Sequence, residues 1–179
     1  MTDAAALLSD IFGFDAFRPG QEEVVRAVAE GENVLAIMPT GGGKSLCYQL
    51  PALMRGGVTV VISPLIALMR DQVVALQAAG VNAGALTSGN TPEETDAVWQ
   101  MLEDRTLRLL YIAPERLASE GAVRMLRRAG VGLIAVDEAH CVSQWGHDFR
   151  PDYLRIGQLR RALDVPLAAF TATADAETR

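Results

Sequence analysis

Hydrophobic residues follow two patterns along the chain: short continuous runs, and runs that repeat every three or four positions. Continuous runs are typical of strands in a parallel sheet covered on both faces, and the longer spacing is typical of helices. The expected strands are residues 34–37, 58–62, 83–86, 107–112, 133–136 and 167–170. The expected helices are residues 3–12, 21–29, 46–54, 65–79, 122–128 and 153–163, with one more beginning at Pro92. This alternation predicts an α/β fold with a mostly parallel sheet and helices on both faces.

Length and composition indicate a single domain over residues 1–179, large enough to bury about 70% of its unfolded surface. Half of the residues are hydrophobic and 21% are charged. No apolar run approaches the roughly 20 residues of a membrane span, and the N-terminus lacks a signal-peptide pattern. Cys47 and Cys141 form no Cys-x-x-Cys pair, which argues against zinc and a disulfide framework. We therefore expect a cytoplasmic protein without membrane contact, nucleoid-associated if bacterial.

The number and distribution of charged residues bear on which ligands the chain could bind. The net charge is −6, which disfavours a dedicated nucleic-acid binder, and Lys44 is the only lysine among sixteen basic residues. Residues 105–128 carry six arginines against two glutamates. We interpret these arginines as a solvent-exposed helix face rather than as a DNA-binding surface.

A glycine-rich segment separates the expected strand at 34–37 from the helix at 46–54. It consists of Met38, Pro39, Thr40, Gly41, Gly42, Gly43, Lys44 and Ser45. Strand, glycine loop and helix in this order predict a phosphate-binding loop, in which backbone N–H groups surround the anion. Lys44 is predicted to reach the β/γ-phosphates of a nucleotide, and Ser45 to place its hydroxyl on Mg²⁺. Met38 departs from the strict pattern, which has glycine there.

Acidic residues follow the expected strand at 133–136. Asp137 and Glu138 should lie at the carboxyl edge of the sheet, because burying carboxylates in mid-strand is costly. The phosphate loop emerges at the same edge, so both motifs can meet over one nucleotide. Asp137 is then predicted to hold Mg²⁺ and Glu138 to orient the attacking water. His140 is interpreted as a link from the γ-phosphate site to neighbouring loops, in preference to a simple turn histidine.

Together, Thr-Gly-Gly-Gly-Lys-Ser and Asp-Glu-Ala-His resemble the motifs of superfamily 2 helicases, whose fold is RecA-like. Four further stretches resemble the RecQ family of DNA helicases, and the resemblance covers essentially the whole chain. These stretches are residues 14–21, 44–49, 63–69 and 111–117. The most specific similarity is Ala-His-Cys-Val-Ser-Gln-Trp-Gly-His-Asp-Phe-Arg-Pro at 139–151.

The resemblance implies roles for residues outside the two motifs. An N-terminal segment over residues 1–30 would recognise adenine through Phe14, Arg18 and Gln21. Without the resemblance, the preferred interpretation of these residues is structural: a hydrophobic staple and a glutamine at a helix start. A loop that senses single-stranded DNA would contain Ser143, Gln144, Trp145, His147, Phe149 and Arg150. Further DNA-contacting or coupling residues would be Ser63, Pro64, Pro114, Arg116, Thr171 and Thr173. The implied cofactors are ATP and Mg²⁺, and the implied partner is single-stranded or forked DNA.

Everything resembling the family lies in its first RecA-like lobe, and we expect the second lobe, with its arginine finger, to be missing. The expected function is the ATP-binding motor lobe of an enzyme that unwinds DNA in the 3′–5′ direction for repair or recombination. By itself the lobe should bind Mg·ATP weakly, hydrolyse it poorly and unwind nothing. Two alternatives remain: an RNA-directed superfamily 2 ATPase, and a non-catalytic nucleotide-dependent binding module.

Overall fold

A computed structural model describes residues 4–38, 43–118, 120–137 and 150–172 of the chain. Their centre is a six-stranded sheet with the order β1-β6-β5-β2-β4-β3, in which every neighbouring pair is parallel. The strands are β1 (Val34–Met38), β2 (Val58–Ile62), β3 (Ala83–Leu86), β4 (Leu109–Ile112), β5 (Val131–Val136) and β6 (Leu167–Ala172). The predicted parallel α/β fold is confirmed.

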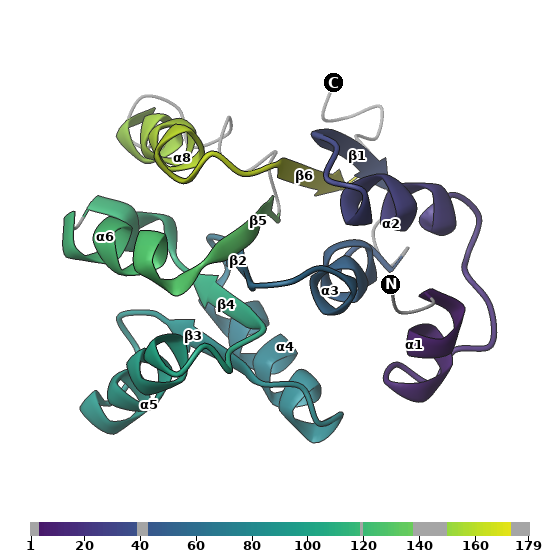
Figure 1. Cartoon of the computed structure of the whole chain (residues 1–179), viewed down its shortest axis with the longest axis horizontal. Helices are drawn as coiled ribbons and strands as arrows, with labels where there is room; N and C mark the ends of the chain where they lie inside the picture. Colours follow the sequence, from purple (N-terminus) through teal and green to yellow (C-terminus); the bar gives the residue numbers. More distant parts are fainter. Residues whose placement is uncertain (1–3, 39–42, 119, 138–149, 173–179) are drawn as a thin grey trace.

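Helices cover the sheet from two sides. The helices are α1 (Ala4–Asp10), α2 (Gln21–Ala29), α3 (Leu46–Met54), α4 (Ile66–Ala78), α5 (Pro92–Glu103), α6 (Glu120–Ala129) and α8 (Arg150–Leu163), with the 3-10 helix η1 at Pro114–Ala118. Figure 1 shows α1 to α4 on one side of the strands, with α5, α6 and α8 on the other. Within the described ranges, none of these helices combines the length and apolarity that a membrane span needs.

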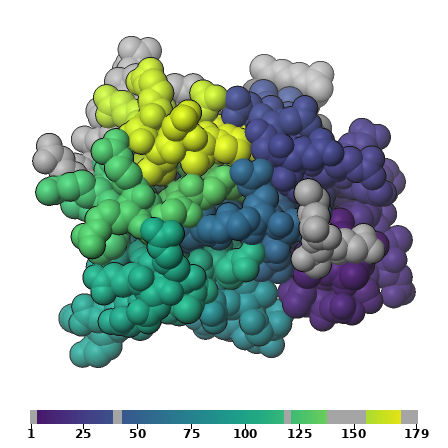
Figure 2. Space-filling model, viewed as in Figure 1, coloured from purple at the N-terminus to yellow at the C-terminus, as the bar shows by residue number. Residues whose placement is uncertain are grey.

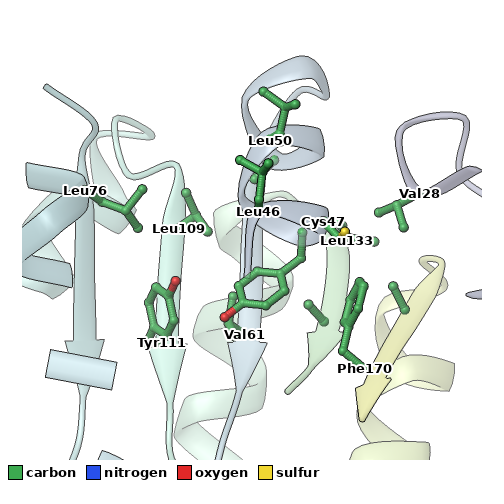
Figure 3. Packing of buried hydrophobic residues seen from close by; sticks show 14 of the residues in the cluster. Val28, Leu46, Cys47, Leu50, Val61, Leu76, Leu109, Tyr111, Leu133 and Phe170 are labelled. Atoms are coloured by element: carbon green, nitrogen blue, oxygen red, sulfur yellow. The ribbon is translucent and has the colours of Figure 1, made fainter. Parts of the chain in front are cut away.

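Two hydrophobic cores occupy the two faces of the sheet, and strand residues alternate between them. On β4, Leu109 and Tyr111 enter the core under α1 to α4, while Leu110 and Ile112 enter the core under α5, α6 and α8. Figure 3 shows Tyr111 of β4 and Phe170 of β6 pointing into the first of these cores. The continuous apolar runs in the sequence therefore reflect burial on both faces.

The edge strand β1 is an exception to this coverage. Leu35 and Ile37 are 68% and 62% exposed, because the described helices leave one face of β1 open. Along one of its edges, β1 pairs with β6, a strand that lies far away in the sequence. In Figure 2 the yellow residues near the C-terminus accordingly lie against the blue-violet residues near the N-terminus.

Most element boundaries agree with the sequence pattern, and the exceptions have local causes. The start of α5 was marked by Thr91 and Glu94, which form a reciprocal capping box. Leu65 falls within the expected helix at 65–79, but it is the residue before α4 and is 42% exposed. Strand β4 begins at Leu109 rather than at 107, and η1 was not expected, because a five-residue helix offers no periodicity to detect.

Parallel strands bring three sequence-distant segments to one edge. Strand β1 ends at Met38, β2 at Ile62 and β5 at Val136. The backbone N–H of Asp137 donates to the carbonyl of Ile62 over 2.9 Å, which aligns the ends of β5 and β2. The carboxyl edge of the sheet is therefore where the phosphate-loop residues and the acidic motif meet.

Candidate functional site

Lys44 and Asp137 lie together at the carboxyl edge of the sheet. The Lys44 Nζ is 3.2 Å from Asp137 Oδ1, with side-chain exposures of 15% and 2%. Lys44 precedes Ser45, the N-cap residue of α3, whereas Asp137 follows β5. The meeting of the two motifs, which the sequence predicted, is thus present as a buried ion pair.

The carboxylate of Asp137 has a second side-chain partner that the sequence did not predict. The hydroxyl of Tyr48 lies 2.9 Å from Asp137 Oδ2. Lys44 lies just before α3, and Tyr48 lies in the first turn of that helix. Two residues of one short segment therefore contact both oxygens of the carboxylate.

Tyr48 begins a network of buried polar side chains. Its hydroxyl also lies 2.8 Å from Gln72 Oε1 on α4, and Gln49 Nε2 donates to the hydroxyl of Tyr111 over 2.8 Å. Burial raises the pKa of Tyr48 well above its ordinary value, and the charges of Tyr111 and Asp137 act in the same direction. The hydroxyl therefore remains protonated. The only sequence signal for a role of Tyr48 at this site was an aromatic residue four positions after Lys44. Nothing in the sequence indicated that Gln72 would contact it.

Ser45 and Gly43 show the local geometry expected of an anion site. Gly43 has a φ of +77°, a conformation that other residues rarely adopt. Ser45 is the N-cap residue of α3, but its side chain makes no capping hydrogen bond. The N-terminus of α3 provides backbone donors and a positive dipole end, and the Ser45 hydroxyl is not used in the cap. Hydroxyl and carboxylate oxygens from Ser45 and Asp137 are the donor types that suit Mg²⁺.

Gln21 connects the predicted adenine segment to the phosphate loop. It is 3% exposed at the start of α2; its Oε1 accepts from the Arg18 backbone N–H over 2.7 Å, and its Nε2 donates to the Gly43 carbonyl over 3.2 Å. A Cβ on Gly43 would lie 2.1 Å from Gln21 Nε2 and would displace this amide, while the positive φ of Gly43 itself favours glycine. Arg18 is exposed, and Phe14 is 50% exposed, which leaves an aromatic face on the surface.

The predicted DNA-contacting residues are placed unevenly. Ser63 is 2% exposed, and its hydroxyl accepts from the Leu65 N–H over 3.2 Å, so it shapes the turn into α4. Pro114 is buried at the start of η1, while Arg116 is partly exposed there. Pro64 and Thr171 are partly exposed at the ends of their segments.

Several predicted site residues lie outside the part of the chain that the structure describes. They are Pro39, Thr40, Gly41, Gly42, Glu138, His140, Ser143, Gln144, Trp145, His147, Phe149 and Thr173. Arg150 is the first residue of α8, but its side chain is also outside that part. Met38, the residue in place of the strict-pattern glycine, is buried at the end of β1.

Several arginines between 105 and 128 bind the carbonyl ends of helices. Arg108 donates to the carbonyls of Ala52, Leu53 and Arg55 at the end of α3. Arg105 donates to the Arg128 carbonyl, and Arg127 to that of Ala162. Arg105 and Arg127 are solvent-exposed, as the interpretation of a solvent-exposed face expects, but that interpretation is wrong for Arg108, which is only partly exposed. All three complete helix C-termini.

Comparison with known proteins places these motifs in a family. Residues 18–179 match the DEAD/DEAH box helicase family. The ATP-dependent DNA helicase RecQ of Bacillus subtilis (strain 168) is 52% identical over 177 residues, which cover 97% of this chain and 30% of that protein. RecQ of Haemophilus influenzae is 49% identical, with 98% and 29% covered. The mouse (Mus musculus) ATP-dependent DNA helicase Q5 is 51% identical, with 93% and 18% covered.

Solved structures show the same fold. The DUF1998 helicase MrfA bound to DNA has a TM-score of 0.75 at 21% identity, covering 98% of this chain and 26% of that one. A hypothetical ATP-dependent RNA helicase from Sulfolobus tokodaii has a TM-score of 0.74 at 21% identity, covering 100% and 53%. The chain spans less than a third of the length of the curated relatives described above. It belongs to the DEAD/DEAH box helicase family and, within it, is of the RecQ type that its sequence motifs predicted.

Proposed function

We propose that the chain is the ATP-binding motor lobe of a RecQ-type DNA helicase. The observation that carries this proposal is the 3.2 Å pair of Lys44 and Asp137, which joins the phosphate loop to the strand-end carboxylate. In phosphoryl-transfer ATPases these two groups serve the phosphates and the metal ion. A carboxylate that is 2% exposed is costly unless it is paired, and a nucleotide site accounts for its burial beside the only lysine of the chain.

Each residue of the site has a defined task in this proposal. The backbone donors at residues 40–43 and at the start of α3 bind the phosphates, and Lys44 adds its ammonium charge. Ser45 and Asp137 would hold Mg²⁺, which neutralises phosphate charge when bound. Glu138 orients the attacking water. His140 links the γ-phosphate position to neighbouring loops.

The placement of Gln21 supports a proposed role in adenine recognition. Its amide bonds to both the Arg18 backbone and the Gly43 carbonyl, which puts the N-terminal segment against the phosphate loop. The exposed ring of Phe14 offers a stacking face, and the exposed Arg18 offers a cation four positions later in the sequence. We assign base recognition to these three residues, with Gln21 also setting the distance between base and phosphate subsites.

DNA is the proposed polymer partner, as single strands or forks. The residues 143–150 follow the acidic motif directly and lead into α8, so bases stacked on Trp145 and Phe149 can influence Glu138. Ser63, Pro64, Pro114, Arg116, Thr171 and Thr173 are proposed as backbone contacts or coupling residues. The curated relatives are named DNA helicases, which favours DNA over the RNA-directed alternative.

The Lys44→Ala variant tests the nucleotide site. Loss of a charged hydrogen bond, worth about 1.5–3 kcal/mol, should weaken binding of a fluorescent ATP analogue at least about tenfold. Circular dichroism should show a retained fold. Arg124→Ala, which removes one positive charge from an exposed position on α6, is the matched control and should bind normally. Equal affinity of Lys44→Ala and the wild type would overturn the assignment of Lys44 to the nucleotide site.

A further inference from the structure

The hydroxyl of Tyr48 lies between two elements of the site. It is 2.9 Å from Asp137 Oδ2 and 2.8 Å from Gln72 Oε1, and Tyr48 is fully buried. A hydroxyl has a single proton, so it can donate to only one of these oxygens at a time. The anionic carboxylate is the stronger acceptor. Gln72 Oε1 faces the hydroxyl here, and a flip of its amide group would instead direct the Nε2 donor at the tyrosine oxygen.

The ring of Tyr48 is held so that this hydroxyl has little freedom. Its centroid is 5.4 Å from that of Phe170 on β6 and 6.4 Å from that of Tyr111 on β4. Both neighbours are themselves buried strand residues. The orientation of the hydroxyl is therefore set by the sheet as well as by α3.

Lys44 and Tyr48 divide the carboxylate between them. Lys44 contacts Oδ1 and Tyr48 contacts Oδ2. When the Lys44 ammonium turns toward a phosphate, the hydroxyl remains as a fixed donor to Asp137. Such partners of a metal-binding carboxylate orient it, and their loss costs about 10–100-fold in metal affinity in known sites.

We propose that Tyr48 is a positioning residue that orients Asp137 for Mg²⁺, and that Gln72 of α4 holds the Tyr48 hydroxyl in place. This inference rests on the proposed nucleotide site. It adds one residue of α3 and one of α4 to the proposed nucleotide site at the end of β5. Because α4 begins three residues after Ser63, this contact also connects Asp137 to the segment proposed to meet DNA.

The test compares Tyr48→Phe with Tyr111→Phe. Both changes remove one hydroxyl from a buried ring, but the Tyr111 hydroxyl accepts from Gln49, whereas the Tyr48 hydroxyl lies 2.9 Å from Asp137 Oδ2. Binding of a fluorescent ATP analogue is measured in EDTA and along a Mg²⁺ titration. For Tyr48→Phe we expect unchanged affinity in EDTA and a half-saturating Mg²⁺ concentration raised about tenfold. Tyr111→Phe should leave both values as in the wild type.

A double-mutant cycle separates positioning from general loosening. If Tyr48 acts through Asp137, Tyr48→Phe should add nothing to the Mg²⁺ requirement of Asp137→Asn. The Gln72→Met variant, which leaves Tyr48 in place, should raise the Mg²⁺ requirement several-fold. It provides the test of the proposal if Tyr48→Phe does not fold. An unshifted titration, an equal shift in Tyr111→Phe, or additivity with Asp137→Asn would overturn the positioning role alone. A wild-type chain that binds no nucleotide under either condition would overturn the proposed function as well.

Discussion

Cys47 shows how the packing of α3 controls the chemistry of single residues near the phosphate loop. Its thiol is fully buried, with Sγ 3.7 Å from Met38 Sδ and 3.8 Å from the Gly43 carbonyl. Figure 3 shows Cys47 beside Leu133 and near Phe170 in the interior. Burial raises the pKa of this thiol from 9.0 to about 12. The residue is therefore a packing group rather than a nucleophile.

Alkylation should reveal this protection. In a Cys141→Ser variant, in which Cys47 is the remaining thiol, iodoacetamide at pH 9 should modify the native chain very slowly, because the thiolate is reduced roughly 10³-fold. The same chain in denaturant should react at an ordinary rate. Native and denatured rates that agree, followed by mass spectrometry, would show that the thiol is accessible.

The same pKa shift has a consequence for stability. Below pH 9 the thiol is neutral in both states, so the free energy of unfolding contains its full contribution. Between pH 9 and about 12 the unfolded chain ionises while the native chain does not, so stability falls as pH rises. Tyr48 and Tyr111, whose pKa values burial also raises, add to this decline above pH 10. Urea titrations across this pH window should show the loss, and Cys47→Ala should reduce its steepness.

At the scale of elements, a close approach of backbones connects the starts of β2 and β5. Gly57 has a φ of +80°, and a Cβ on it would lie 2.3 Å from the carbonyl oxygen of Gly130. The Val58 N–H donates to that same carbonyl over 3.3 Å. The two central strands of the sheet thus depend on a glycine at this position.

Gly57→Ala should lower the free energy of unfolding by at least about 1–3 kcal/mol, because it adds both backbone strain and a steric conflict. Gly56→Ala is the matched control, since a Cβ there meets nothing within 4 Å. It should change stability by less than about 1 kcal/mol. Equal urea midpoints for the two variants would argue against the close approach.

Arg108 makes a second contact between elements, from the start of β4 to the end of α3. Replacing it with methionine removes the donor to three helix carbonyls and should cost about 1.5–3 kcal/mol in thermal or urea unfolding. Arg124→Met, on the exposed side of α6, should stay within about 0.5 kcal/mol of the wild type. A stable Arg108→Met variant would mean that water replaces the guanidinium.

For the whole molecule, the central point is that the chain spans less than a third of the length of the three curated relatives described above. An arginine finger accelerates phosphoryl transfer by about 10³–10⁵-fold, and none of the proposed site residues supplies one. We therefore expect the 179-residue chain to bind Mg·ATP but to hydrolyse it orders of magnitude more slowly than a full-length relative, without DNA unwinding. A phosphate-release assay with and without single-stranded DNA tests this. Hydrolysis at full-length rates, stimulated by DNA, would refute it.

The polymer partner can be decided in the same assay on a full-length protein that contains this chain. Stimulation by single-stranded DNA and not by RNA is expected, with Trp145→Ala reducing it because base stacking contributes about 1–3 kcal/mol per base. Stronger stimulation by RNA would favour the RNA-directed alternative.

By itself, the sequence determined most helix and strand positions, the parallel α/β class, and the two motifs at 38–45 and 137–140. These depend on periodicity and on residue types at short spacing, which are local properties. Only the tertiary structure decided the strand order, the open face of β1 and the role of Arg108. It also decided that Tyr48 contacts Asp137, a residue 89 positions away. Such contacts depend on how the sheet brings distant strand ends together. Local sequence patterns do not specify this arrangement.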